Sequence, residues 1–143
     1  MKKFLLVAFV LSLGVFAHAA ADPCANAPKI KVAISQTAST KLITGVAGSK
    51  IYVCHFHIVT TLANNVAIVE GTGSTCGTGT AGVAGGTTAA TGWNLPANGI
   101  LPLGNGAAAI MQADAASGDD VCLLQSAATQ VSGTLIYVRT VTN

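Results

Sequence analysis

Two histidines, His55 and His57, form the pattern closest to a chemical site. On a β-strand, alternate residues point to the same face, so both imidazoles would lie on one side. A metal centre of the cupin type would need a third histidine and a nearby carboxylate. The next carboxylate is Glu70, beyond a turn, and no histidine follows His57. We therefore predict no metal ion and no cofactor. If the two histidines pack between subunits, they would make assembly sensitive to mildly acidic pH.

Other residues with chemical potential lack the partners that catalysis needs. Asp114, Asp119 and Asp120 cluster in DAASGDD, but their spacing matches no calcium loop, and we assign them to a turn. The glycine-rich GTGSTCGTGTAG has no P-loop lysine, and no G-x-S-x-G elbow presents a nucleophilic serine. The prediction is that the protein is not an enzyme.

Trp93, within TGWNLPANG, is a candidate contact residue. An exposed indole at this loop would suit a sugar or a protein partner. The alternative is that the ring anchors the loop against the core. Both interpretations remain open from the sequence.

Four cysteines, Cys24, Cys54, Cys76 and Cys122, follow the first twenty residues. An even number in an exported chain indicates two disulfides, and no pair has the short spacing of a zinc site. Of the three possible pairings we favour Cys54 with Cys122, because both lie in apolar strand-like runs. That leaves Cys24 with Cys76. Such long closed loops contribute roughly 3–5 kcal/mol each in the chain-entropy model.

The N-terminal residues have the pattern of a signal peptide over residues 1–21. Lys2 and Lys3 precede an apolar stretch at residues 4–16, and small residues then allow cleavage after Ala19 or Ala21. An uncleaved membrane anchor is the alternative, but the stretch is shorter than the ~20 residues that span a bilayer. We expect export to the periplasm, cell surface or extracellular space, with no stable membrane insertion after cleavage.

The charge balance excludes some partners. Seven basic residues include Lys2 and Lys3, so five remain after the leader and are matched by five acidic residues. A nearly neutral domain has no basic face for nucleic acid or an anionic membrane. Its surface must consist largely of Thr, Ser, Asn, Gly and Ala.

Residues 22–143 have the pattern of one all-β domain. Short runs rich in β-branched residues alternate with Gly and Asn turns, which predicts an antiparallel β-sandwich or barrel of jelly-roll type. Strict alternation in the longest run groups Tyr52, Cys54, Phe56 and Ile58 on one face and Ile51, Val53, His55, His57 and Val59 on the other. The predicted strands are residues 29–35, 41–44, 51–61, 66–70, 100–103, 107–112, 120–126 and 131–141.

Two segments are less regular. Residues 107–116 have the alternative of a helix on propensity, although the flanking glycines favour a strand. Residues 71–92 are rich in Gly and Thr, and Cys76 within them predicts an ordered surface loop pinned to the domain.

The whole pattern resembles a family of small phage-encoded structural proteins. The resemblance rests on the G-x-K-I-Y-V entry in AGSKIYVCHFHIV, on the Asn-Gly turn in GWNLPANGILPLGNG, and on a closing V-x-G-x-L-x-Y strand. In that strand the motif residues are Val131, Gly133, Leu135 and Tyr137. Such proteins are β-sandwich modules that decorate capsids or form tail and fibre parts. The resemblance implies virion association and supplies no catalytic residues; the leader is a departure from it.

These observations support a structural protein that self-associates or decorates a larger assembly, such as a virion or an extracellular filament. Its partners would be copies of itself, as a homo-oligomer, or another structural protein, and not nucleic acid. The alternative is a secreted or cell-surface binding module that recognises glycans through the loops around Trp93. An exported enzyme is the third hypothesis.

Overall fold

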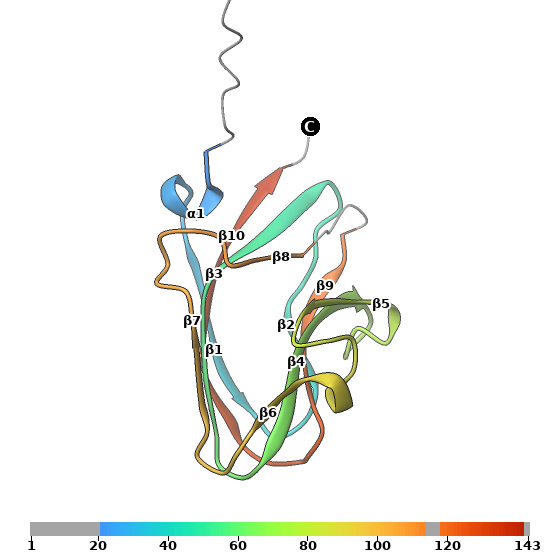
Figure 1. Cartoon of the computed structure of the whole chain (residues 1–143). Coiled ribbons are helices and arrows are strands. Elements are labelled where there is room, and N and C mark those ends of the chain that lie inside the picture. The colour runs from blue at the N-terminus through green and yellow to red at the C-terminus, as the bar shows by residue number, and fades with distance from the viewer. Residues whose placement is uncertain (1–20, 114–117, 142–143) are drawn as a thin grey trace, which may run out of the picture.

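The computed structural model describes residues 21–113 and 118–141, which form two antiparallel β-sheets packed face to face (Figure 1). The predicted leader, apart from Ala21, lies outside the described residues, as does Asp114. Sheet A contains β1 (Ile30–Gln36), β10 (Val131–Val141), β3 (Ser49–Thr60), β7 (Ile100–Leu103) and β8 (Met111–Ala113). Sheet B contains β2 (Thr40–Ile43), β9 (Asp120–Gln125), β4 (Asn64–Thr72), β5 (Thr78–Ala84) and β6 (Trp93–Leu95).

The strand order is that of a jelly roll. Sheet A has the order β1-β10-β3-β7, with β8 also pairing with β3, and sheet B has the order β2-β9-β4-β5, with β6 also pairing with β4. The chain crosses between the sheets at six of the nine connections between successive described strands, and all the pairings are antiparallel. Two four-stranded sheets wound in this way define the jelly roll. The predicted all-β sandwich is confirmed.

Aliphatic side chains from the two inner faces fill the space between the sheets. Fully buried members include Ile51, Phe56, Ile58, Ile68, Leu123 and Leu135. Each such side chain contributes roughly 1.5–3 kcal/mol by leaving water. The core therefore determines how the two sheets pack. Side chains that face outward take no part in this packing and are available for other contacts.

A β-bulge at Cys54 divides β3 into two halves. The ladder with β10 pairs Val53 and His55 with consecutive residues of β10, so Cys54 is an extra residue without a partner there. An extra residue reverses the alternation of side chains beyond it. Val53 and Phe56 consequently both face the core and are fully buried. The predicted strict alternation, which placed these two residues on opposite faces, is wrong for this reason.

The short helix α1 (Pro23–Asn26) packs on the outer face of sheet A beside this bulge (Figure 1). The Asp22 carboxylate accepts the N–H of Cys24 at 2.8 Å as an N-cap, and Pro23 occupies the first turn. Asp22 also accepts the N–H of Ala109 at 3.0 Å. A disulfide joins Cys24 to Cys54, so the N-terminal part of α1 is held both by this bond and by Asp22.

The second disulfide joins Cys76 to Cys122 on the outer face of sheet B. The number of disulfides is as predicted, but the favoured pairing of Cys54 with Cys122 and of Cys24 with Cys76 is wrong. Cys54 and Cys122 belong to the outer faces of opposite sheets, with the core between them. Disulfide-bonded residues need Cα atoms roughly 4.4–6.8 Å apart, which that separation forbids. Two disulfides indicate an oxidising environment.

Several elements differ from their predicted ranges. The segment 71–92, predicted as an ordered loop, contains the edge strand β5 and the short 3-10 helix η1 (Ala89–Thr91), and Cys76 pins it as expected. Residues 78–82 of β5 are exposed, so they carry no alternation of buried side chains. In place of the predicted strand at 107–112, the strand β8 begins only at Met111.

In the described part of the chain, no helix is long and apolar enough to cross a bilayer.

Gly133 is required where β10 lies against β3. A β-carbon built at this position would lie 1.9 Å from the carbonyl oxygen of His57. Replacing Gly133 by alanine must therefore push the two strands apart, and we expect a loss of about 3 kcal/mol in the free energy of unfolding. Urea unfolding of the purified variant measures it.

Gly77→Ala is the matched control. Only the Thr75 hydroxyl, at 3.9 Å, lies within 4 Å of the new β-carbon, so we expect a change below about 0.5 kcal/mol. Equal losses in the two variants would contradict a close approach specific to Gly133.

Each disulfide should contribute about 4 kcal/mol, because the bridged cysteines are 30 and 46 residues apart. Equilibrium unfolding of the double variants Cys24→Ala/Cys54→Ala and Cys76→Ala/Cys122→Ala tests this. Non-reducing peptide mapping should recover the same two pairs. A peptide linking Cys54 to Cys122 would contradict the described fold.

Candidate functional site

The histidine pair lies on the outer face of sheet A, beyond the bulge of β3. The ring centroids of His55 and His57 are 6.5 Å apart with an interplanar angle of 18°. His55 Nδ1 lies 2.9 Å from the carbonyl oxygen of Gly104, which requires a proton on Nδ1 and leaves Nε2 available. As predicted, both imidazoles share one face.

The described residues do not supply the further ligands that a metal ion needs. Within residues 21–113 and 118–141, no group of three or more His, Cys, Asp and Glu side chains could hold a metal ion. Two imidazoles alone leave a structural zinc ion short of its four ligands. Both imidazoles belong to the outer surface of sheet A.

The outer face of sheet A carries mainly small, hydroxyl-bearing and apolar side chains. The strand registers set neighbouring residues of β1, β10, β3 and β7 in rows across the sheet. These rows are Lys31, Ile136 and His55; then Ala33, Thr134, His57 and Pro102; then Ser35, Ser132, Val59 and Ile100. One lysine is the single charged residue of the three rows. Such a face imposes no pattern of charge on a partner.

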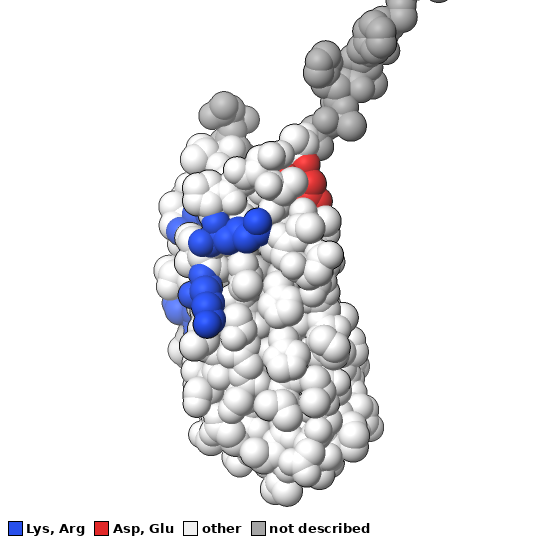
Figure 2. All heavy atoms as spheres, turned by 90° about the vertical axis from the view of Figure 1, so that its left-hand side faces the viewer, with Lys and Arg blue, Asp and Glu red and all other residues white. Residues whose placement is uncertain are grey.

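The charge-free surface continues to the end of the sandwich that lies farthest from α1. We call this the distal end; it consists of the loops at residues 37–39, 61–63, 96–99 and 126–130, and none contains Lys, Arg, Asp or Glu. In Figure 2, Lys and Arg gather in the upper half of the visible face, while the lower half is uncharged. Two large apolar residues are exposed at this end or directly beside it, Leu62 at 59% and Ile100, the first residue of β7, at 61%.

A buried asparagine holds the distal end rigid. The Asn64 side-chain oxygen accepts the backbone N–H groups of Ser126 and Ala127 at 3.0 and 3.1 Å. Its amide nitrogen donates to Gln125 Oε1 at 3.1 Å and to Thr129 Oγ1 at 3.0 Å. Because these bonds satisfy both ends of the amide, the turn after β9 is a fixed part of the surface.

A shallow hollow lies on the outer face of sheet B, above the Cys76–Cys122 disulfide. Its volume is about 420 Å³. Its lining consists of Thr75, Cys76, Gly77, Thr80, Thr87, Thr88, Ala89 and Leu124. Four of these are threonines and none has an acidic, basic or imidazole side chain, so a hydroxyl here lacks the base that nucleophilic catalysis needs. Sequence reasoning missed the hollow, because its lining comes from two stretches of the Gly/Thr-rich segment and from Leu124 of β9.

Trp93 packs against the core and is half-buried. Its ring stacks on Phe56 with centroids 6.2 Å apart, and it lies beside Gly85, where a β-carbon would come within 2.9 Å of the indole. Its backbone pairs with Val66 of β4. These contacts fit the anchoring interpretation, while a role in partner contact stays a prediction.

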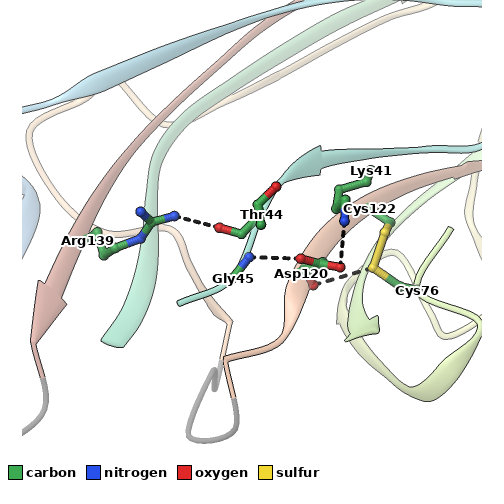
Figure 3. Close-up of polar contacts among 7 residues, drawn as sticks. All are labelled: Lys41, Thr44, Gly45, Cys76, Asp120, Cys122 and Arg139. Atoms are coloured by element: carbon green, nitrogen blue, oxygen red, sulfur yellow. Dashed lines mark hydrogen bonds and ion pairs between the residues drawn. A yellow bond between two sulfur atoms is a disulfide. The ribbon is translucent and has the colours of Figure 1, made fainter. Parts of the chain in front are cut away.

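A line of polar contacts joins the two sheets at the end near the termini (Figure 3). Arg139 of β10 donates to the carbonyl oxygen of Thr44 at 2.6 Å, and the next residue, Gly45, donates its N–H to Asp120 at 2.9 Å. Lys41 forms an ion pair with the same carboxylate at 3.0 Å. Asp120, which the turn assignment of DAASGDD and the predicted strand at 120–126 both included, is the first residue of β9, as the strand prediction has it. The contacts connect β10, β2 and β9.

The surroundings of Asp120 change its pKa in two opposing directions. Burial raises the pKa of this carboxyl group, while the Gly45 N–H and the Lys41 ammonium group lower it. The lowering effects prevail, so the pKa lies below its ordinary value. The carboxylate is therefore a structural anion that holds β2 against β9.

Comparison with known proteins identifies no relative. No family model, no curated protein and no solved structure matches this chain.

Replacing Asp120 by asparagine should lower the free energy of unfolding at neutral pH by about 1–3 kcal/mol, because a charged hydrogen-bond partner is lost. A pKa lowered by folding contributes stability above the unfolded value of about 3.9, and this stability is lost as pH falls through the folded pKa. The difference between the two proteins should therefore shrink below pH ~4. Denaturant unfolding across a pH series measures it.

Asp119→Asn is the control, since it removes the same charge one residue away from the Lys41 ion pair. We expect little change in its stability at any pH. A loss in Asp119→Asn as large as that in Asp120→Asn would show that net charge, and not this contact, is responsible.

Proposed function

We propose that this protein is a non-enzymatic structural component that self-associates or decorates a larger assembly outside the cytoplasm. The assembly is an extracellular filament or a virion-like particle, as the resemblance to phage structural proteins implies. The protein acts as a repeated subunit of this assembly, and its role is to form contacts with neighbouring subunits.

The observation that carries this proposal is the segregation of charge. The distal end and the adjoining rows of sheet A form a continuous surface with a single lysine at its margin. Monomeric proteins commonly use mixed surface charge to prevent association. A neutral surface with exposed Leu62 and Ile100 instead loses little by being covered.

The rigidity of the domain supports the same role. A disulfide on the outer face of each sheet holds the two segments that add least to the core, α1 and the turn before β5. The Asn64 network fixes the distal turn. A pre-organised surface loses little conformational entropy on association, which favours a permanent contact.

The threonine-lined hollow supports a second candidate, a secreted binding module for glycans. Thr75 and Thr87 offer hydroxyl groups suited to a neutral polar ligand, whereas the hydroxyls of Thr80 and Thr88 bond to Cys76 and Thr91 within the chain. The lining includes no aromatic ring on which a sugar could stack. A saturable glycan-array signal that Thr75→Val and Thr87→Val remove would favour this function over assembly.

Size-exclusion chromatography with light scattering, followed by negative-stain electron microscopy, tests self-association. The protein should be expressed with its own leader and kept oxidised. We expect a discrete oligomer or filaments at micromolar concentration. Because the surface is neutral, assembly should persist when salt screens charges to a Debye length of about 3 Å in 1 M NaCl.

A monomer at every concentration and salt level would contradict self-association. Dissociation by salt would show that the charged end near α1, and not the neutral surface, carries the contact. Trp93 lies outside the proposed assembly surface. The variant Trp93→Ala therefore tests separately whether the indole contacts a partner.

A further inference from the structure

The free strand edges of the two sheets differ in their ability to pair with another chain. An unpaired edge presents backbone N–H and C=O groups, and proteins normally block it with bulges, proline, short strands or charge. Sheet A ends at β1 on one side and at β7 and β8 on the other; sheet B ends at β2 on one side and at β5 and β6 on the other.

Three of these four edges are blocked. The β7 and β8 edge is divided into strands of four and three residues, and Pro102 removes a donor from it. β2 is four residues long and its register shifts. β5 is longer, but its register shifts twice, and Gly79 has a positive φ of 67°.

β1 has none of the structural interruptions that block the other edges. Its seven residues pair with β10 in an unbroken register from Ile30 to Gln36. Ala33 and Ser35 face outward and are exposed, while Ile34 faces the core. The opposite side of β1 is the margin of the sheet.

The sequence of β1 is complementary to itself when two copies run antiparallel. Centred on Ala33, the full overlap of both strands sets Ala33 opposite Ala33, Val32 opposite Ile34, and Lys31 opposite Ser35. Outward residues meet outward residues, and inward residues meet inward residues, as a continuous sheet requires. The overlap allows about six to eight main-chain hydrogen bonds between the copies.

Full overlap of the two strands favours this register, and charge is compatible with it while excluding the register centred on Lys31. The two copies of Lys31 lie four residues apart along the strands, or about 14 Å, beyond the Debye length of about 8 Å at physiological ionic strength. A register centred on Lys31 would set the two ammonium groups directly opposite each other, which is destabilising. Lys29, just before the strand, would lie opposite Thr37.

We propose that two copies of this protein pair antiparallel through β1 with the dyad at Ala33, joining two five-stranded sheets into one of ten strands. This inference rests on the proposed self-association and adds a pairwise contact at the margin of the neutral surface. The two neutral outer faces of sheet A then become one continuous surface, available for higher assembly.

Engineered cysteines test the register. Ala33→Cys places two thiols opposite each other at the dyad, within disulfide range, so oxidised protein should form a covalent dimer about tenfold faster than Thr78→Cys on the edge of β5. Lys31→Cys and Ser35→Cys should not cross-link alone but should cross-link when mixed. The four native cysteines are all disulfide-bonded and do not interfere. Non-reducing electrophoresis and intact mass identify the products.

Cross-linking of Ala33→Cys no faster than that of Thr78→Cys would overturn the interface. Cross-linking of Lys31→Cys alone would overturn the register.

A substitution that introduces a charge at the dyad distinguishes failure of the β1 interface from failure of the proposed self-association. Ala33→Lys sets two ammonium groups opposite each other and should dissociate the dimer in light scattering, whereas Thr78→Lys should not. Oligomers that survive Ala33→Lys would overturn the β1 interface and leave self-association standing. A wild-type protein that is monomeric throughout would overturn both.

Discussion

The pairing of β10 with β3 is the contact on which the rest of this structure depends. It runs through the middle of sheet A and contains one bulge, at Cys54. Val53 before the bulge and Phe56 after it both reach the core. The same bulge turns Cys54 outward, where Cys24 of α1 meets it. One inserted residue thus determines the buried face, the site of a disulfide and the outward position of the histidine pair.

The hydrophobic core and the disulfides stabilise different parts of the domain, and this explains why its surface carries few charges. Aliphatic side chains between the sheets hold the strands together, and the disulfides hold the segments outside that core. The ionic contact between Lys41 and Asp120 lies at the end near the termini, as does the contact of Arg139 with Thr44. The loops of the distal end carry no charged side chain, and the three rows on the outer face of sheet A carry only Lys31. A surface of this kind is suited to being covered by a neighbour.

Local patterns predicted those strands that bury side chains. The predicted ranges 100–103 and 131–141 coincide with β7 and β10, and the long run at 51–61 corresponds to β3 within two residues. β5 was missed because its first five residues are exposed and carry no hydrophobic alternation. β6 has only three residues, and α1 has four, too few for a periodicity to show. The face assignment in β3 failed because alternation assumes a register without bulges.

Local sequence patterns were limited in the same way for the histidine pair, the distribution of charge and the hollow. The sequence predicted that His55 and His57 would share a face, since residues i and i+2 do so on any strand. It also showed that the domain is nearly neutral, but not that the four loops of the distal end, which contain no charged residue, lie together (Figure 1). The hollow above the second disulfide draws its lining from residues between Thr75 and Leu124, which no local motif connects.

By itself, the sequence determined the composition-dependent properties: an all-β domain, two disulfides suited to an oxidising environment, and a balanced charge. Only the tertiary structure decided which cysteines meet, which residues face the core around Cys54, and which edge strand is left regular and open. The physical reason is that these properties depend on hydrogen-bond registers between strands far apart in the chain. Local periodicity gives a strand its two faces, but its partners decide which face is buried and which edge is free.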